Sequence, residues 1–232
     1  MNFRDHWRAV EKELLARGLS HSTIEPFATY SPWLNDKPFQ SLVEKIRDFT
    51  LVDIYRLWEL KSLLTSSNRV EGDILEVGVW RGGTGALLCK FSPHKKVWLA
   101  DTFIGIVKDG ERDLSYNGGE HADTSCETVE GLMSSLKLVN FELLKGVFPD
   151  DTGNFIPEVL SLVHIDVDVY ESAKQIWNFV HHRLAVGGVI VFDDYGFSST
   201  DGVTSFVNEI SELDNFFFLY NLNGHAIFVK IR

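Results

Sequence analysis

From Gly72 onward, short apolar runs alternate with helical stretches, and this pattern limits the possible folds more than any other feature of the chain. Such alternation is typical of βαβ units in a parallel sheet. The predicted strands are residues 74–77, 97–100, 141–144, 160–165, 189–192, 216–220 and 226–230. Because only residues 221–225 separate the last two strands, they should form a hairpin. We therefore expect an α/β fold with a seven-stranded, mostly parallel sheet that has helices on both faces and an antiparallel last strand.

Helical periodicity describes the remaining segments. Apolar residues spaced as on one helix face predict helices within residues 7–14, 39–46, 54–64, 129–136, 173–184 and 203–210. Thr124 and Glu127 have the spacing of a capping box ahead of the fourth of these. Residues 26–38 hold three prolines, which favours an ordered loop or lid that covers the substrate, contacts a second subunit or simply packs on the body. We divide the chain into an N-terminal helical extension or lid, residues 1–70, and an α/β domain, residues 71–232.

Composition excludes several classes of protein. The 232 residues carry 22 Lys and Arg against 33 Asp and Glu, a net charge of -11 that repels nucleic acid. No apolar stretch reaches the length of a membrane span, and the first residues lack the pattern of a signal peptide. The two cysteines, Cys89 and Cys126, are too few for a disulfide framework. We expect a cytoplasmic protein with neither nucleic-acid nor membrane partners.

The first predicted strand runs into a glycine turn that contains Gly78, Gly82 and Gly83. Glycine at a strand-to-helix turn lets the backbone approach a ligand, and the helix start presents free amides. The spacing G-x-x-x-G-G differs from the dinucleotide and phosphate-cradling motifs. The turn therefore favours a nucleoside cofactor without phosphates, with a packing role for the glycines as the alternative.

Three more positions support a cofactor at this edge of the sheet. Asp101 ends the second strand, 101 − 76 = 25 residues after Glu76, close to the offset of about 20 at which a carboxylate binds ribose hydroxyls. Phe103 could flank the adenine or belong to the core. Gly146 belongs to another glycine turn, after the third strand.

Four carboxylates follow the next two strands, namely Asp166, Asp168, Asp193 and Asp194. Neighbouring parallel strands would bring these residues together, and buried carboxylates without Arg or Lys partners are costly unless a cation joins them. With no Cys and no His at ligand spacing, oxygen ligands favour Mg²⁺, Ca²⁺ or Mn²⁺ over zinc. Alternatively, these residues cap the helices that follow.

The order and spacing of these motifs resemble those of the macrocin-type O-methyltransferases, which methylate sugar hydroxyls of macrolide and aminocoumarin antibiotics. The resemblance covers roughly residues 50–212 and is carried by residues 76–83, 101–103, 146–148, 164–172 and 187–196. It implies a class I methyltransferase (Rossmann-like) domain in residues 71–232 and a metal held by Asp166, Asp193 and Asp194. The S-adenosylmethionine site that it implies comprises Glu76, Gly78, Trp80, Arg81, Gly82, Asp101, Phe103 and Gly146.

These features together predict a metal-dependent enzyme that transfers a methyl group from S-adenosylmethionine to a hydroxyl oxygen of a sugar-containing small molecule. Asp166 and Asp168 are the candidate catalytic bases, while His121, His164 and His225 remain possible. The alternatives are a catechol-type O-methyltransferase and a non-catalytic Ca²⁺-dependent domain that binds a sugar or a partner. The glycine spacing disfavours a dehydrogenase. We expect a homo-oligomer, most simply a dimer.

Overall fold

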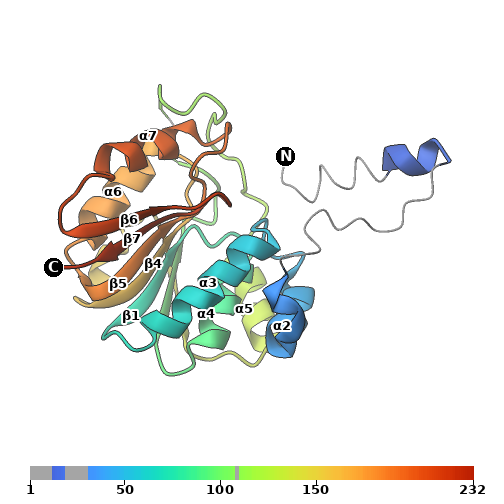
Figure 1. The fold of residues 1–232 in the computed structure, drawn as a ribbon, viewed down its shortest axis with the longest axis horizontal. Coiled ribbons are helices and arrows are strands. Elements are labelled where there is room, and N and C mark those ends of the chain that lie inside the picture. Colours follow the sequence, from blue (N-terminus) through green and yellow to red (C-terminus); the bar gives the residue numbers. More distant parts are fainter. Residues whose placement is uncertain (1–11, 19–30, 108–109) are drawn as a thin grey trace.

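A computed structural model of the chain describes residues 12–18, 31–107 and 110–232. Its centre is a seven-stranded sheet with helices on both faces (Figure 1). The strands are β1 Asp73–Val77, β2 Val97–Asp101, β3 Phe141–Lys145, β4 Leu160–Ile165, β5 Leu184–Phe192, β6 Phe216–Tyr220 and β7 Ala226–Lys230. The helices are η1 Pro32–Asn35, α2 Lys37–Ile46, α3 Ile54–Ser67, α4 Gly83–Phe91, α5 Cys126–Ser135, η2 Gly153–Phe155, α6 Tyr170–Val180 and α7 Asp201–Ile210.

The strand order is β3-β2-β1-β4-β5-β7-β6, with β1 to β5 parallel and β7 antiparallel to both neighbours. The predicted mostly parallel sheet with an antiparallel last strand is therefore confirmed. In the sheet, β2 lies on one side of β1 and β4 lies on the other side, so the order of the strands reverses between β1 and β4. The carboxyl ends of β1 and β4 thus form the switch point of the sheet, where ligands of open α/β folds bind.

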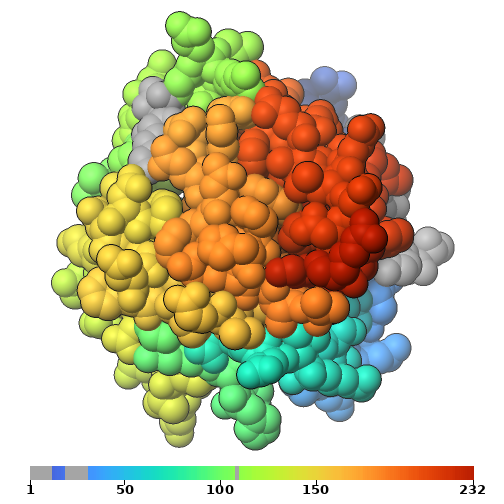
Figure 2. Space-filling model, turned by 90° about the vertical axis from the view of Figure 1, so that its left-hand side faces the viewer, coloured from blue at the N-terminus to red at the C-terminus, as the bar shows by residue number. Residues whose placement is uncertain are grey.

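Alternation along the strands divides the core into two layers. In β1, Ile74 packs beneath the helices on one face of the sheet, whereas Leu75 and Val77 point to the other face. Figure 1 shows α2, α3, α4 and α5 on the first face and α6 and α7 on the second. On the second face, the Trp177 ring of α6 contacts the rings of Phe216 and Phe228, each at a centroid distance of 5.0 Å. Figure 2 shows this face from outside, with the orange side chains of α6 at its centre.

Residues 31–67 share the first core layer with the sheet. The apolar stripes predicted for α2 and α3 are buried there, as is the η1 residue Trp33. Most of the helix predicted within residues 7–14, and residues 26–30 of the predicted loop, lie outside the described residues. None of the described helices combines the length and the apolarity that a membrane crossing requires.

Two predicted helix boundaries are wrong. Leu184 begins β5, whereas α6 already ends at Val180. The N-cap of α5 is Ser125, whose hydroxyl accepts a hydrogen bond from the Thr128 amide at 3.2 Å. Thr124 does not cap the helix, because its hydroxyl donates to the backbone carbonyl of Trp80 in the glycine turn after β1.

Candidate active site

A cavity of about 800 Å³ opens at the carboxyl ends of the parallel strands. One part of its wall comes from the turns after β1, β2 and β3, and another part comes from the ends of β4 and β5. A third wall, residues 49–56, leads into α3 and is largely apolar. The predicted cofactor turn and the predicted acidic site therefore line the same cavity, through Gly78, Trp80, Asp101, Gly146, Asp166 and Asp193.

The turn after β1 lies so close to the end of β4 that no side chain fits at Gly78. Gly78 has a φ of +91°, and a Cβ built on it would lie 1.7 Å from the carbonyl oxygen of Asp166. In addition, the Asp166 amide donates to the Val77 carbonyl at 2.9 Å. Glycine at this position therefore allows the turn after β1 to lie directly against Asp166.

Asp101 holds the glycine turn in shape. Its Oδ2 accepts hydrogen bonds from the amides of Val79 at 2.7 Å and Trp80 at 2.8 Å, and its Oδ1 accepts from the Phe103 amide at 2.7 Å. Trp80 and Phe103 both have a positive φ, a backbone conformation that such bonds stabilise. The predicted contact between Asp101 and a ribose stays a prediction, and the position of Asp101 on the cavity wall is compatible with it.

The other predicted cofactor residues divide into two groups. Trp80 and Gly146 line the cavity with Gly78 and Asp101. Four residues lie off the cavity wall, each with another contact. Phe103 is buried in the core, Gly82 caps α4 against Val129, Arg81 pairs with Asp123 at 2.5 Å, and Glu76 lies in the sheet beneath α4.

The predicted acidic site forms where β4 and β5 end side by side. The Asp193 amide donates to the Ile165 carbonyl at 2.9 Å, which places Asp193 next to Asp166. Asp166, Asp193 and Asp194 each present a carboxylate oxygen within 4.8 Å of the other two. Burial, together with the charges of Asp193 and Asp194, raises the pKa of Asp166 well above its usual range.

Asp168 contacts this cluster from the turn before α6. Its φ is +62°, and its Oδ1 accepts a hydrogen bond from the Tyr116 hydroxyl at 2.8 Å. Burial and the charge of Asp194 raise its pKa well above the usual range, although the bond from Tyr116 acts in the opposite direction. Tyr116 and Asp168 both line the cavity.

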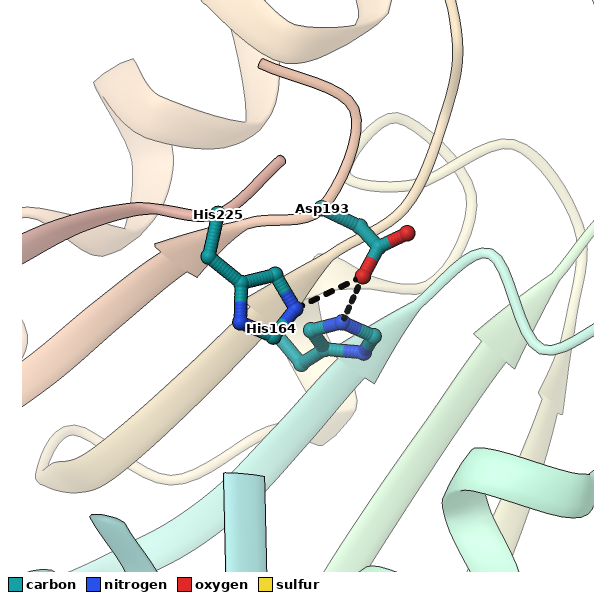
Figure 3. A group of neighbouring side chains, drawn as sticks. All are labelled: His164, Asp193 and His225. Carbon is teal, nitrogen blue, oxygen red and sulfur yellow. Dashed lines mark hydrogen bonds and ion pairs between the residues drawn. The ribbon is translucent and has the colours of Figure 1, made fainter. Parts of the chain in front are cut away.

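The premise that no histidine stands at ligand spacing is wrong, because His164, Asp193 and His225 each present a possible ligand atom within 4.8 Å of the other two. His164 is the penultimate residue of β4 and His225 directly precedes β7, and both rings point toward the same oxygen of Asp193 (Figure 3). The Nε2 atom of His225 lies 2.8 Å from Asp193 Oδ1, and that of His164 lies 3.5 Å from it. Their Nδ1 atoms contact Glu59 at 2.6 Å and Glu76 at 3.0 Å. Burial would lower the pKa of His164, but its bonds to Asp193 and Glu76 outweigh burial and raise that pKa to about 9.

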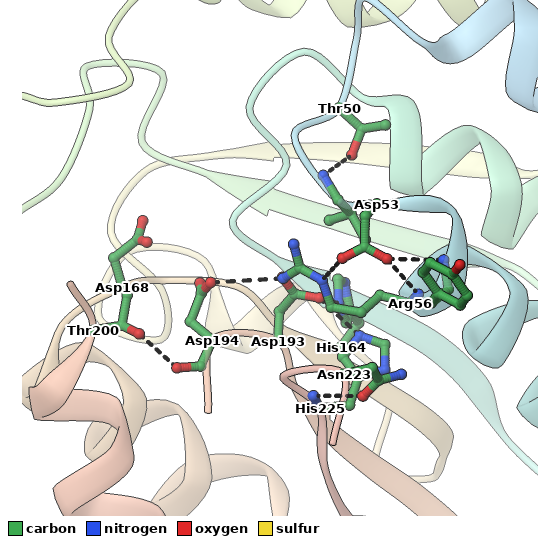
Figure 4. A network of polar contacts seen from close by, with 12 residues as sticks. Thr50, Asp53, Arg56, His164, Asp168, Asp193, Asp194, Thr200, Asn223 and His225 are labelled. Carbon is green, nitrogen blue, oxygen red and sulfur yellow. Dashed lines mark hydrogen bonds and ion pairs between the residues drawn. The ribbon is translucent and has the colours of Figure 1, made fainter. Parts of the chain in front are cut away.

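The premise that these carboxylates lack a basic partner is also wrong. Arg56 of α3 is buried and forms ion pairs with Asp193, with Asp194 at 3.7 Å and with Asp53 at 2.9 Å (Figure 4). Burial would raise the pKa of Asp193, but Arg56 and the two imidazoles outweigh burial and hold it well below its usual range. Asp193 is therefore the most acidic carboxyl group of the cluster.

Helix α3 supplies site residues that the sequence analysis missed. Arg56 and Glu59 are three positions apart and therefore on one face, where Arg56 contacts Asp193 after β5 and Glu59 contacts His225 before β7. Asp53 caps the same helix, because its Oδ1 accepts from the Tyr55 amide at 2.8 Å. The sequence analysis recognised the apolar stripe of this helix. The charged residues beside that stripe, Arg56 and Glu59, could have indicated that the helix also contributes to the site. Tyr116 lies in residues 108–123, for which no role was predicted.

The donor set fits a divalent cation even with Arg56 present. Asp166, Asp168 and Asp194 all have raised pKa values, caused by burial first and then by the neighbouring carboxylates. For Asp166 and Asp194, the opposing charge of Arg56 does not offset burial and the repulsion between carboxylates. Oxygen donors converging within 4.8 Å are the chemistry that Mg²⁺ binds.

Comparison with known proteins identifies the family. The model of the macrocin O-methyltransferase (TylF) family matches residues 44–216, which is well over half of the chain. The chain belongs to the macrocin O-methyltransferase family. The resemblance predicted from the motifs is thereby confirmed. Among the site residues described above, His225 lies beyond the matched segment.

Two curated relatives align with the chain over 164 positions, and each alignment covers 63% of the chain. Mycinamicin III 3''-O-methyltransferase of Micromonospora griseorubida is 32% identical, and demethyldecarbamoylnovobiocin O-methyltransferase of Streptomyces niveus is 30% identical. The matches cover 65% and 62% of these relatives, just under two thirds of their length. The structure of the O-methyltransferase NovP superimposes with a TM-score of 0.67 at 25% identity, over 79% of this chain and 83% of that one. The class I methyltransferase fold is thus confirmed.

Proposed function

We propose that the protein transfers the methyl group of S-adenosylmethionine to a sugar hydroxyl of a small-molecule natural product, with a divalent cation held by Asp166, Asp193 and Asp194. One observation carries the proposal. A single cavity joins the glycine turn after β1 to four carboxylates at the ends of β4 and β5. A methyl donor on the turn would therefore lie next to groups that can activate an oxygen nucleophile.

The methyl donor is assigned to the wall formed by Gly78, Trp80, Asp101 and Gly146. Backbone amides at this turn and the Asp101 carboxylate offer hydrogen-bond partners for a nucleoside. Asp101 already accepts three amide hydrogen bonds, so its carboxylate is fixed in place before the ligand arrives. Such preorganisation lowers the entropy cost of binding.

For the chemical step, the acceptor hydroxyl has to reach the sulfonium methyl group in line and lose its proton. Asp166 and Asp168 line the cavity with raised pKa values, which makes either of them a better proton acceptor than an ordinary carboxylate. The oxygen–methyl bond forms as the sulfur–methyl bond breaks, S-adenosylhomocysteine leaves, and the proton passes to the carboxylate. A divalent cation, when bound, lowers the pKa of the hydroxyl and orients it.

The acceptor class rests on the relatives, whose names describe sugar-bearing antibiotics. The cavity supports this choice, because its acidic end suits hydroxyl groups and its third wall offers apolar side chains to the rest of an acceptor. That wall includes Phe49, Val52, Ile54 and Tyr55, and Trp33 also lines the cavity. A catechol would use the same carboxylates and is the second candidate.

A paired acceptor screen tests the proposal. The protein is incubated with S-adenosylmethionine and either glycosides with neighbouring hydroxyls or catechols, and a mass gain of one CH₂ is recorded. We expect methylation of glycosides in Mg²⁺, none in excess chelator, and recovery when Mg²⁺ is restored. Methylation of catechols alone would contradict the sugar assignment. Full turnover in chelator would contradict the metal.

Tyr116 provides a further test, because its hydroxyl donates to one of the two candidate bases at 2.8 Å. A hydrogen bond to a charged group is worth roughly 1.5–3 kcal/mol. We expect Tyr116→Phe to lower kcat roughly tenfold or more while affinity for S-adenosylhomocysteine stays unchanged in calorimetry. The matched control is Tyr170→Phe, whose hydroxyl bonds to Glu209 away from the cavity. Equal kcat values for the two variants would remove Tyr116 from the catalytic machinery.

A further inference from the structure

Arg56 lies between two sets of carboxylates. On one side its Nε contacts Asp53 Oδ2 at 2.9 Å. On the other, its Nη1 contacts Asp193 Oδ2 and lies 3.7 Å from Asp194 Oδ1. Figure 4 shows the guanidinium between these groups. Among the described residues that line the cavity, Arg56 is the sole lysine or arginine, and its side chain is only 7% exposed.

This position conflicts with a second positive charge at the same carboxylates. Asp193 and Asp194 are two of the three residues whose oxygens converge within 4.8 Å. The Oδ1 atom of Asp193 already accepts from His225 at 2.8 Å, so Oδ2 is the oxygen that remains for a cation. Arg56 occupies that oxygen, and a dication close to the guanidinium would be repelled by it.

Asp53 offers Arg56 a place to remain when it releases Asp193. The carboxylate of Asp53 is fixed as the N-cap of α3 by the Tyr55 amide at 2.8 Å and the Arg56 amide at 3.2 Å. The centroid of the Phe197 ring lies 5.1 Å from the guanidinium carbon, so the ring can stabilise the guanidinium through a cation–π interaction. The guanidinium can therefore give up one carboxylate and keep a charged partner.

We propose that Arg56 and a divalent cation compete for the Asp193–Asp194 pair, so that Arg56 sets the affinity of the acidic site for metal. This inference rests on the metal site of the proposed function. Arg56 keeps the cluster partly neutralised before the cation binds, and cation binding shifts the guanidinium toward Asp53. Asp53 belongs to residues 49–56, which form one wall of the cavity. Metal binding at the aspartates is therefore coupled, through Arg56, to the position of that wall.

The test measures Mg²⁺ affinity by calorimetry in the full-length wild-type protein and in Arg56→Gln, Asp53→Asn and the double variant. Arg56→Gln should bind Mg²⁺ roughly tenfold or more tightly, because the competing charge is gone. Asp53→Asn should weaken binding several-fold, since Arg56 loses its other partner, while asparagine still caps the helix. In the double variant the effect of Asp53→Asn should vanish, which is the signature of coupling through Arg56.

Two controls separate competition from general charge effects and from misfolding. Lys61→Gln removes a positive charge from the same helix, but the ion-pair partner of Lys61 is Asp36, which lies outside the cavity. This variant should bind Mg²⁺ with an affinity within about twofold of the wild type. Thermal unfolding provides a second readout. Without metal, Arg56→Gln should melt below the wild type, and saturating Mg²⁺ should raise its Tm by more than it raises that of the wild type.

The outcomes distinguish this inference from the proposed function. Equal Mg²⁺ affinity in wild type and Arg56→Gln would overturn the competition and leave the metal site intact. An Asp53→Asn effect that persists in the double variant would also overturn it, because long-range charge would then suffice. Absence of Mg²⁺ binding in all the proteins would overturn the competition together with the metal part of the proposed function, whereas methyl transfer itself is judged by the acceptor screen.

Discussion

Replacing Asp166 with asparagine should abolish methyl transfer while making the metal-free protein more stable. The side chain keeps its shape but loses its charge, so turnover should fall by at least about a thousandfold, the combined effect of a lost base and a weakened cation site. The pKa of Asp166 lies above its unfolded value, so the ionised carboxylate destabilises the folded state once the pH exceeds that unfolded value. Removing the charge should therefore raise the free energy of unfolding at neutral pH.

Three measurements check this result. Initial rates are compared at saturating Mg²⁺, urea unfolding is followed in chelator, and S-adenosylhomocysteine binding is titrated. Cofactor affinity should remain within about threefold, since the donor is assigned to other strand ends. Asp214→Asn, at a side chain that is 93% exposed, is the control that should change nothing. Turnover within tenfold of the wild type would remove Asp166 from the chemistry.

Replacing Gly78 with alanine should damage both the fold and the cofactor site. The new Cβ would meet the Asp166 carbonyl oxygen at 1.7 Å, and the backbone at φ +91° disfavours any L side chain. Strain at positive φ costs about 1–2 kcal/mol, and overpacking adds about 1–3 kcal/mol. We expect the free energy of unfolding to fall by roughly 3 kcal/mol or more and S-adenosylhomocysteine binding to be lost.

Gly119 offers a matched control for this change. Its φ is +86°, close to that of Gly78, but a Cβ there would meet no atom within 4 Å. Gly119→Ala should therefore show the backbone cost alone, about 1–2 kcal/mol. The difference between the two variants in urea unfolding measures the clash with β4. If Gly78→Ala and Gly119→Ala lower the free energy of unfolding equally, the close approach of β1 and β4 does not contribute to the cost of Gly78→Ala.

Much of the fold could be predicted because local patterns coincide with the tertiary arrangement. The seven predicted strands all exist, and the glycine turn and the four aspartates follow the strands to which they were assigned. Boundaries were less predictable where two patterns overlap. Leu184 continues the apolar spacing of α6 and yet begins β5, and Thr124 has a capping-box spacing although Ser125 caps the helix.

The predicted cofactor residues differ in their position relative to the cavity. Glu76, Arg81, Gly82 and Phe103 belong to the motifs of the family, but their side chains or backbone lie off the cavity wall. Of these four residues only Glu76 lies in a strand, where neighbouring side chains point to opposite faces of the sheet, and its side chain lies beneath α4. Glu76 pairs instead with His164 on the neighbouring strand.

By itself, the sequence determined the parallel sheet, the strand ends that carry glycine or carboxylate, and the family to which the chain belongs. Each of these depends on residues close together in the chain or on the period of the apolar pattern. Only the tertiary structure decided the charge balance of the site. Arg56 and Asp193 are 137 residues apart, and His225 and Glu59 are 166 apart. No local pattern encodes these pairs, because they arise from α3 packing beside the switch point, where β1, β4 and β5 end together.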